Sequence, residues 1–340
     1  MQSPRLTFPF YRNDPATVVV DRAGTAESVH LVDAVVVDVD GNVVMGIGDI
    51  ERSIFPRSAM KPLQSIALVE ALAATDHDLS HEELALITAS HNAEAFHVEL
   101  VLALLKRLGL SADDLSCGAH WSIDQATSIS QAKAMDAPTK AHNNCSGKHA
   151  GMLMLGDILG APVKGYADLN HPVQQRILGV LEQMTGMDLM QHPYGIDGCG
   201  APALSGPMGN WARGFAVFAD PSSVSDERAA AIEAIRQGVA SAPLMIAGTG
   251  RACSAVAEVY GPLMTVKTGA EGVFAAAFHN LGLGLMLKAR DGNKRGAEVA
   301  LGAIIDALGY DHDARLDPFF RPELRNWAGD QVGAITATLA

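Results

Sequence analysis

The sequence predicts an α+β fold in which an antiparallel sheet is flanked by helices. Strand-like runs alternate with turns over residues 17–50, helical periodicity dominates from about 60 to 245, and strand-like runs return after about residue 263. A parallel βαβ series would instead alternate strand and helix along the whole chain. We therefore expect one structural unit over 1–340, with a helical middle region and a sheet contributed by both chain ends.

A β-hairpin is predicted close to the N-terminus. The strand-like run 34–39 is followed by Asp40-Gly41-Asn42, and the chain then returns through residues 43–45. Asp-Gly favours tight turns because glycine readily adopts positive φ. Further strands are predicted at 252–260, 263–267 and 334–340.

Apolar residues recur at helical spacing in the rest of the chain. Glycine-rich turns at 195–207 and 247–250 separate these segments from the later strands. Helices are predicted at 63–74, 93–109, 147–160, 171–186, 226–241 and 293–308.

Composition excludes several classes of protein. The chain is 48% hydrophobic and 19% charged, which provides for a large core and excludes global disorder. Its net charge of −13 and the lack of a basic patch predict no nucleic-acid partner. No apolar stretch is long enough to span a bilayer, so no membrane partner is expected.

The N-terminal residues Met1 to Arg5 precede no apolar segment of the kind that a secretory signal contains, so we expect a cytoplasmic protein. In a reducing compartment the cysteines are expected to be thiols, metal ligands or core residues rather than disulfides. The chain has four, Cys117, Cys145, Cys199 and Cys253.

Three short motifs follow one another along the chain: Ser58-Ala59-Met60-Lys61, Ser90-His91-Asn92 and Lys267-Thr268-Gly269. An S-x-x-K, an S-x-N and a K-T-G in this order form the motif set of serine β-lactamases and penicillin-binding proteins. Each motif alone is common by chance, but the ordered set predicts a serine acyl-transfer enzyme.

Ser58 and Lys61 are the predicted nucleophile and base. Helical spacing places the lysine one turn from the serine, and backbone N–H groups at a helix start can stabilise an oxyanion. Pro62 is expected to push Lys61 out of the α region and make this turn irregular. Ser90 can relay protons to Lys61 or Lys267, although Ser90 or Asn92 can equally cap the following helix.

A second group of residues suggests a metal site. Cys145 and Cys199 are framed by glycines and polar residues, and two thiolates with Lys148 or His149 can bind zinc. Asp197 can then orient a ligand from the second layer of contacts. The alternative is that both cysteines are ordinary core or turn residues.

These motifs together resemble the rhizobial-type L-asparaginases (class 3, asparaginase II family), from about residue 15 to the chain end. The blocks that carry the resemblance are Arg57 to Pro62, Ser90 to Asn92, His142 to Met152, Gly195 to Pro202, Lys267 to Val273 and Asn326 to Gly329.

The resemblance implies a fold similar to serine β-lactamases and glutaminases, L-asparagine as substrate, and a homodimer. It implies Ser58 with Lys61 and Ser90 with Lys267 as two catalytic Ser–Lys pairs. The implied zinc ligands are Cys145, Lys148 and Cys199, and the implied substrate-binding residues are Asp197, Arg57 and His149. Many family members carry an Arg-Phe-Asp type of sequence after Gly-Thr-Gly, where this chain has Arg251-Ala252-Cys253, so the resemblance leaves open the role of Arg251 and its neighbours in substrate binding.

Two other functions stay open at the level of sequence. One is a glutaminase or another amidohydrolase of the β-lactamase fold, including an enzyme that acts on penicillins. The other is a non-catalytic relative that binds an amino acid or zinc. The intact Ser58, Lys61, Ser90 and Lys267 favour an enzyme.

Overall fold

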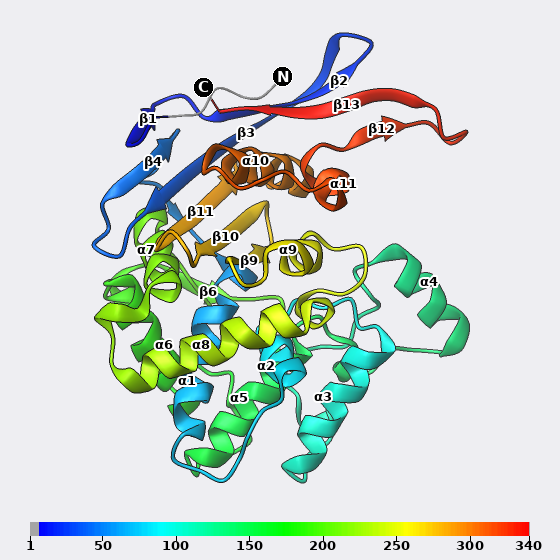
Figure 1. Cartoon of the computed structure of the whole chain (residues 1–340). Helices are drawn as coiled ribbons and strands as arrows, with labels where there is room; N and C mark the ends of the chain where they lie inside the picture. Colours follow the sequence, from blue (N-terminus) through cyan, green and yellow to red (C-terminus); the bar gives the residue numbers. More distant parts are fainter. Residues whose placement is uncertain (1–6, 340) are drawn as a thin grey trace.

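The computed structural model describes residues 7–339. A nine-stranded sheet runs through the upper half of the molecule in the order β12-β13-β2-β3-β11-β10-β9, with β4 and β1 joined at β3 (Figure 1). The strands are β1 (Phe10–Arg12), β2 (Ala16–Arg22), β3 (Thr25–Val37), β4 (Val43–Ile47), β5 (Ser53–Ile54), β6 (Tyr194–Ile196), β7 (Pro202–Leu204), β8 (Gly206–Pro207), β9 (Met264–Gly269), β10 (Val273–Phe278), β11 (Leu283–Ala289), β12 (Glu323–Arg325) and β13 (Gln331–Thr338).

Strands from both ends of the chain pair with each other in this sheet. In the antiparallel pair of β2 and β13, Thr17 lies opposite Thr338 and Arg22 lies opposite Gly333. The sheet is antiparallel except for the short pairing of β1 with β4. The predicted α+β class with an antiparallel sheet is therefore confirmed, and so is the predicted hairpin, formed by β3 and β4.

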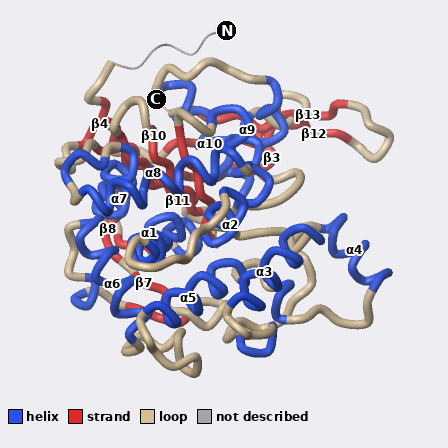
Figure 2. Tube along the Cα trace, turned by 60° about the horizontal axis from the view of Figure 1, so that its bottom comes forward, coloured by secondary structure: helices blue, strands red, loops and turns tan. Residues whose placement is uncertain are grey.

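Helices surround the sheet and fill the rest of the molecule (Figure 2). They are α1 (Lys61–Leu72), α2 (His81–Ile87), α3 (Ala95–Arg107), α4 (Gln125–Ala134), α5 (Ser146–Ile158), α6 (Pro172–Thr185), α7 (Met208–Ala219), α8 (Asp226–Ser241), α9 (Ala252–Tyr260), α10 (Lys294–Ala307) and α11 (Asp317–Phe320). The six helices predicted from periodicity are all present, as α1, α3, α5, α6, α8 and α10.

Helices α7 and α10 cover opposite faces of the central strands. A Cβ on Gly284 of β11 would lie 2.0 Å from the carbonyl oxygen of Ala212, so the glycine lets α7 approach the sheet closely. Gly284 pairs with Val37 of β3, and His30 of the same strand points to the other face, where it lies against Gly296 of α10. The sheet is thus buried on both sides.

One strand prediction is wrong. Residues 252–260 form α9 rather than a strand, because their buried residues follow the helical rows 252, 256, 260 and 253, 257. A short apolar run with a single charged residue, Glu258, fits both periods, and the helix buries its apolar residues. The strand predicted at 334–340 is β13, which begins earlier, at Gln331; Ala340 lies outside the described residues.

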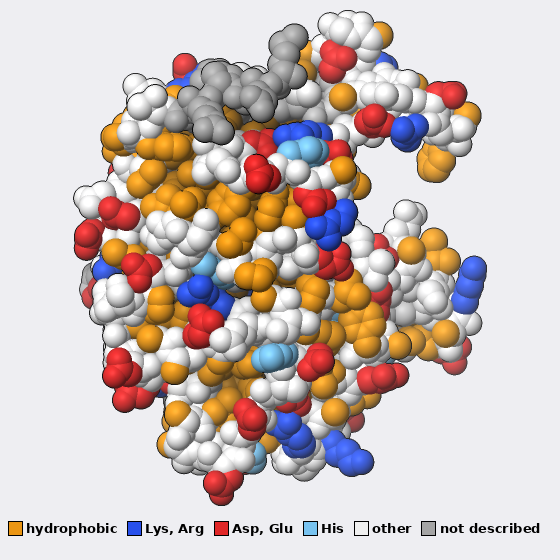
Figure 3. Space-filling model, in the orientation of Figure 1, with side chains coloured by type: hydrophobic (Ala, Val, Ile, Leu, Met, Phe, Trp, Pro, Cys, Tyr) orange, Lys and Arg blue, Asp and Glu red, His pale blue; other side chains and the backbone are white. Residues whose placement is uncertain are grey.

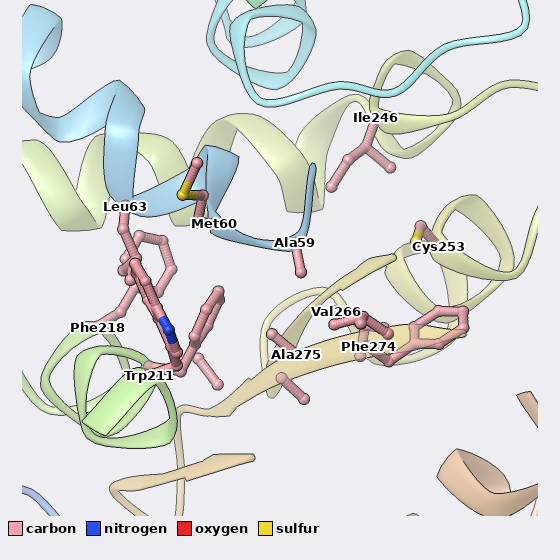
Figure 4. Packing of buried hydrophobic residues seen from close by; sticks show 14 of the residues in the cluster. Ala59, Met60, Leu63, Trp211, Phe218, Ile246, Cys253, Val266, Phe274 and Ala275 are labelled. Atoms are coloured by element: carbon pink, nitrogen blue, oxygen red, sulfur yellow. The ribbon is translucent and has the colours of Figure 1, made fainter. Parts of the chain in front are cut away.

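The core next to the sheet lies beneath the residues of the first motif (Figure 4). Ala59 and Met60 are buried with Leu63 of α1, and they pack among Trp211 of α7 and Val266 of β9. This packing fixes the start of α1 against the sheet. No helix within residues 7–339 has the length and apolarity needed to cross a membrane.

The hairpin of β12 and β13 stands away from the body, and a notch separates it from the part of the surface formed by α4 (Figure 3). Trp327 lies in the loop that joins the two strands and is fully exposed.

Candidate active site

Ser58 lies in a short 3₁₀ turn, Arg57–Met60, that leads directly into α1. Its side chain is half-buried and makes no hydrogen bond to any residue in the range 7–339. The residue before it, Arg57, has φ +53°, a left-handed conformation that costs a non-glycine residue free energy. This unusual backbone conformation sets the orientation of the next residue, the predicted nucleophile Ser58.

The predicted irregularity at Lys61 is wrong. Lys61 is α-helical, with φ −57° and ψ −39°, and is the first residue of α1. Pro62 fits because its missing N–H falls in the first turn of the helix, where no backbone partner is needed.

Ser90 is held between two buried lysines. Lys61 Nζ donates to Ser90 Oγ at 3.0 Å and Lys267 Nζ lies 2.9 Å from the same oxygen. The structure therefore brings three of the predicted catalytic residues together directly. Lys61 does not hydrogen-bond to Ser58; its other acceptors are Ala89 O at 2.5 Å and Cys145 Sγ at 3.1 Å.

The two lysines differ in their surroundings. Lys267 is fully buried in β9, and burial lowers its pKa to about 7, with further lowering by the positive charges of Lys61 and Arg251. Lys61 has three acceptors within reach, which suits an ammonium group with three N–H bonds. Lys267 is therefore suited to exchange a proton near neutral pH.

Cys145, Lys148 and Cys199 also converge. Cys145 precedes the first turn of α5, Lys148 lies one turn later, and Cys199 comes from the loop between β6 and β7. Lys148 Nζ donates to Cys199 Sγ at 3.2 Å, and all three residues are buried.

The two thiols and the lysine of this cluster shift one another's pKa. A hydrogen bond from the Cys199 thiol, with Lys61 and Lys148 nearby, lowers the pKa of Cys145 far below that of an ordinary thiol. The same hydrogen bond, together with burial, raises the pKa of Cys199. Burial opposes the charge of Lys148, but the two sulfurs outweigh it and raise its pKa.

Arg57 and Asp197 form an ion pair beside this cluster. Arg57 Nη2 lies 2.7 Å and Nε 3.1 Å from Asp197 Oδ1, which also accepts from Gly198 N at 2.6 Å. Although burial raises the pKa of Asp197, the hydrogen bond from Arg57 and the charge of Lys148 outweigh it and lower the pKa, so the carboxylate is ionised. The structure therefore places the predicted acidic residue between a cation and the cysteine cluster.

His149 faces Tyr166 instead. Its Nδ1 lies 2.7 Å from the Tyr166 hydroxyl, which also accepts from Ser116 N, and the imidazole is fully buried. Burial lowers the pKa of His149 well below its usual value, so the ring is neutral.

The structure also corrects the capping alternative for the second motif. The residue that caps α3 is Glu94, not Ser90 or Asn92, and no side chain accepts a capping hydrogen bond there. Asn92 instead donates through Nδ2 to Thr249 O at 3.0 Å and accepts from Arg251 Nη1 at 2.7 Å.

Sequence reasoning named Arg251 without a role and missed its contact with Asn92, because no spacing rule links the two residues. The four cysteines are free and buried. Cys117 has a pKa raised to about 12 by burial, which suits the structural role expected of it.

Comparisons with known proteins complete the description. A β-lactamase from Mycobacterium bovis aligns over 82% of this chain and 94% of its own, with 13% identity and a TM-score of 0.44. The native form of a protein called Mglu aligns over 83% of this chain and 66% of its own, with 13% identity and a TM-score of 0.46. These scores are too low to support a conclusion about function.

A search of curated proteins finds no significant match. A family model described as L-asparaginase II, in contrast, matches residues 18–337, nearly the whole chain. That span contains all three motifs, both cysteines of the cluster, and the Arg57–Asp197 pair. The chain therefore belongs to the L-asparaginase II family and is an amidohydrolase.

Proposed function

We propose that the chain hydrolyses L-asparagine to L-aspartate and ammonia through a serine acyl-enzyme. The observation that carries this proposal is the position of Ser90 Oγ, within hydrogen-bonding distance of two buried lysines, one of which has a pKa of about 7. Together with the half-exposed Ser58 at the start of α1, this arrangement provides a nucleophile and a proton acceptor.

Ser58 is the proposed nucleophile because it is the more accessible of the two serines. Ser90 is buried, and its oxygen lies between two lysine nitrogens. In the acylation step a bond forms between Ser58 Oγ and the side-chain amide carbon of asparagine, and the carbon–nitrogen bond of the amide breaks. Backbone N–H groups of the turn that contains Ser58 are the proposed donors to the oxyanion.

The proton of Ser58 has to reach the leaving nitrogen. We propose that Lys61 first passes a proton through Ser90 to the neutral amine of Lys267, which exchanges protons near neutral pH. The amine of Lys61, one turn from Ser58, then has a lone pair and takes the proton of Ser58. The same proton is then donated to the amide nitrogen, which leaves as ammonia. Water subsequently hydrolyses the ester and releases aspartate.

Asp197 and Arg57 are proposed to bind the substrate. The ionised carboxylate of Asp197 suits the α-ammonium group, and Arg57 holds that carboxylate in place. His149 is also a substrate-binding residue implied by the resemblance. We propose that it contributes indirectly, because its hydrogen bond with Tyr166 supports α5.

The donor set of Cys145, Lys148 and Cys199 fits a zinc ion, since zinc binds sulfur and nitrogen donors in tetrahedral sites. The fit depends on a lysine as third ligand: within residues 7–339 no cluster of three or more His, Cys, Asp and Glu side chains could hold a metal. When bound, zinc would supply a positive charge that keeps both sulfurs as thiolates and helps to position the α-amino or α-carboxylate end of the substrate. Lys148 would bind through its neutral amine.

Replacement of the proposed nucleophile tests the function. Ser58→Ala is expected to lose nearly all ammonia release from L-asparagine, whereas Ser130→Ala, an exposed position on α4, is expected to keep it. Ser58→Ala with near wild-type turnover would reject Ser58 as the nucleophile. The wild-type enzyme is assayed in parallel with L-glutamine and nitrocefin, and preferred turnover of either would support the glutaminase or β-lactam alternative. Tight binding of asparagine without turnover would support a non-catalytic protein.

Metal analysis tests the zinc proposal. Purified wild-type protein is expected to contain about one zinc per chain, and Cys145→Ser or Cys199→Ser to lose it, while Cys117→Ser keeps it. Equal zinc content in all four proteins would refute the proposed ligands.

The homodimer is proposed on the family resemblance alone. Light scattering on the purified chain should give twice the mass of 35.7 kDa, and a monomeric mass would refute it.

A further inference from the structure

We infer that Arg251 binds the α-carboxylate of the substrate and so restricts the enzyme to free α-amino acids that carry a side-chain amide. This inference rests on the proposed function, because it concerns the same site. It assigns a specificity-determining role to a residue whose part in substrate binding the family resemblance leaves open.

The first support is the link between Arg251 and the second motif. Arg251 Nη1 donates to Asn92 Oδ1 at 2.7 Å, and Asn92 Nδ2 donates to Thr249 O at 3.0 Å. One buried amide thus holds both the side chain of Arg251 and the loop that leads to it. Asn92 is two residues from Ser90, so the guanidinium is tied to the segment that contains the relay serine.

The backbone reinforces this link. Ser90 N donates to Ile246 O at 3.0 Å and Asn92 N donates to Ala247 O at 2.9 Å, so the two segments run side by side. Gly248 (φ +106°) and Gly250 (φ +68°) then turn the chain into α9, for which Arg251 is the N-terminal capping position.

A third contact fixes the other side of the site. Thr268 N donates to Cys253 Sγ at 3.3 Å, which joins the first turn of α9 to the end of β9. Arg251 precedes that turn and Lys267 precedes Thr268, so this contact brings the two backbone segments together. The charge of Arg251 accordingly contributes to the lowered pKa of Lys267. Arg251 is therefore at the edge of the Ser90–Lys267 pair.

Arg251 is also a cation without an anionic partner. It forms no ion pair with any residue in the range 7–339. The two nearest candidate carboxylates are otherwise engaged: Glu94 accepts from Thr249 N, and Glu298 pairs with Lys294. The remaining N–H groups of the planar guanidinium suit a carboxylate, which they can bind in a bidentate manner.

The location is accessible to a small molecule. Arg251 is half-buried, the preceding Thr249 and Gly250 are exposed, and the end of β9 at Thr268 and Gly269 is half-buried. In contrast, Arg57 already pairs with Asp197 and is not free for an anion. The site thus offers a carboxylate, Asp197, for the α-ammonium and a free cation, Arg251, for the α-carboxylate.

Binding measurements with a carboxylate-blocked substrate test the inference. The dissociation constants of L-asparagine and of its α-carboxamide, L-aspartic acid diamide, are measured by calorimetry in a Ser58→Ala background, with and without Arg251→Gln. We expect Arg251→Gln to weaken L-asparagine roughly 30-fold or more, since it removes a charged partner, and to leave the diamide almost unchanged. Arg251→Lys, which retains the charge without the planar fork, should lose less.

Arg213→Gln is the matched control, because Arg213 is also half-buried, has a single hydrogen bond to Met184 O and forms no ion pair within 7–339. It should change neither dissociation constant. Unchanged asparagine binding in Arg251→Gln, or equal weakening of both ligands, would overturn the inference and leave Arg251 as a loop-fixing residue. If Arg251→Gln fails to fold, Arg251→Lys gives the same comparison. Failure of the proposed function shows separately, as wild-type protein that releases no ammonia from L-asparagine.

Discussion

Lys267 shows how the environment of a single side chain determines its chemistry. Nothing in Lys267-Thr268-Gly269 distinguishes a solvated lysine at a strand end from a buried one, and only the packed sheet reveals complete burial. Burial disfavours the charged form, and Lys61 and Arg251 add repulsion, so the pKa falls to about 7. The sequence could therefore identify the residue but not its protonation state.

The pH dependence of activity should report this group. We expect kcat/KM to rise with pH along a limb centred near 7, because the neutral amine of Lys267 is the proton acceptor and it forms as the pH passes its pKa. Lys267→Met should remove nearly all activity, and Lys164→Met, an exposed position, should keep both the activity and the limb. A flat profile from pH 6 to 8 in the wild-type enzyme would contradict the assignment.

The same shift predicts a change in stability. The unfolded lysine titrates near 10.5 and the folded one near 7, so the unfolded chain binds more protons between these values and the free energy of unfolding rises with pH across that window. Lys267→Met should abolish the rise and stabilise the protein at pH 7 by on the order of 3 kcal/mol. Urea denaturation at pH 7 and pH 9 measures both effects. Equal stability of the two proteins at pH 7 would argue against a strongly lowered pKa.

The structure brings together most of the residues that the sequence predicts to be catalytic, but not every contact expected between them is present. The contact between Ser90 and Lys267 is present, whereas Ser58 and Lys61 share a helix face without a hydrogen bond. Spacing along a helix predicts which residues are neighbours. A lysine side chain with four methylenes, however, is long and flexible enough to reach several hydrogen-bond acceptors. Lys61 reaches Ala89, Ser90 and Cys145 because these come from segments that only the fold brings near.

At the scale of elements, the start of α1 and the end of β9 depend on each other. A Cβ on Gly269 would lie 2.3 Å from Pro56 O and 3.3 Å from Ala59 N. The strand end is therefore in backbone contact with the turn that presents Ser58. No helix or strand pattern could predict this contact, because it joins two segments far apart in the sequence.

Gly269→Ala tests this contact. The added methyl group must displace backbone atoms rather than a flexible side chain, so we expect a loss of 1–3 kcal/mol in stability, about the usual cost of overpacking, and a large loss of kcat. Gly179→Ala in α6 is the control, since its Cβ would meet no atom within 4 Å, and it should stabilise the protein by about 1 kcal/mol. Thermal unfolding and steady-state kinetics measure both, and full activity in Gly269→Ala would show that the turn tolerates displacement.

Helices were the easier elements to predict. The six segments with helical periodicity are all helices in the structure. An apolar face repeated over three or four turns is a pattern that few other structures produce. The short segment 252–260 was misassigned because nine residues with few charges fit both periods. Apart from the hairpin of β3 and β4, the partner of each strand was beyond prediction, since those pairings depend on contacts across most of the chain.

At the scale of the whole molecule, β13 completes the sheet. It is the only partner of β2 on that side, and β12 lies beyond it at the edge. Ile335 and Leu339 are buried there. The last residues of the chain are therefore structural, although the motifs lie far from them in the sequence.

Truncation after Asp330 should destabilise the protein strongly. It removes the antiparallel pairing of β13 with β2, exposes the edge of β2, and leaves Val18 and Val20 less covered. We expect a lower unfolding temperature and aggregation in size-exclusion chromatography. A full-length variant with Trp327→Ser in the exposed loop is the control, and it should behave as the wild type. A truncated protein with an unchanged unfolding temperature would contradict this view.

The pairing of β2 with β13 also constrains how the enzyme is made in the cell. Thr338 is synthesised long after its partner Thr17, so one edge of β2 stays unpaired during translation for roughly 15 to 60 seconds. During this time the emerging chain carries an unpaired strand edge that other nascent chains or chaperones can bind. Ser58 is synthesised early as well, but β9 and its Lys267 come only in the last quarter of the chain. The active centre can therefore assemble only after β9 has been synthesised.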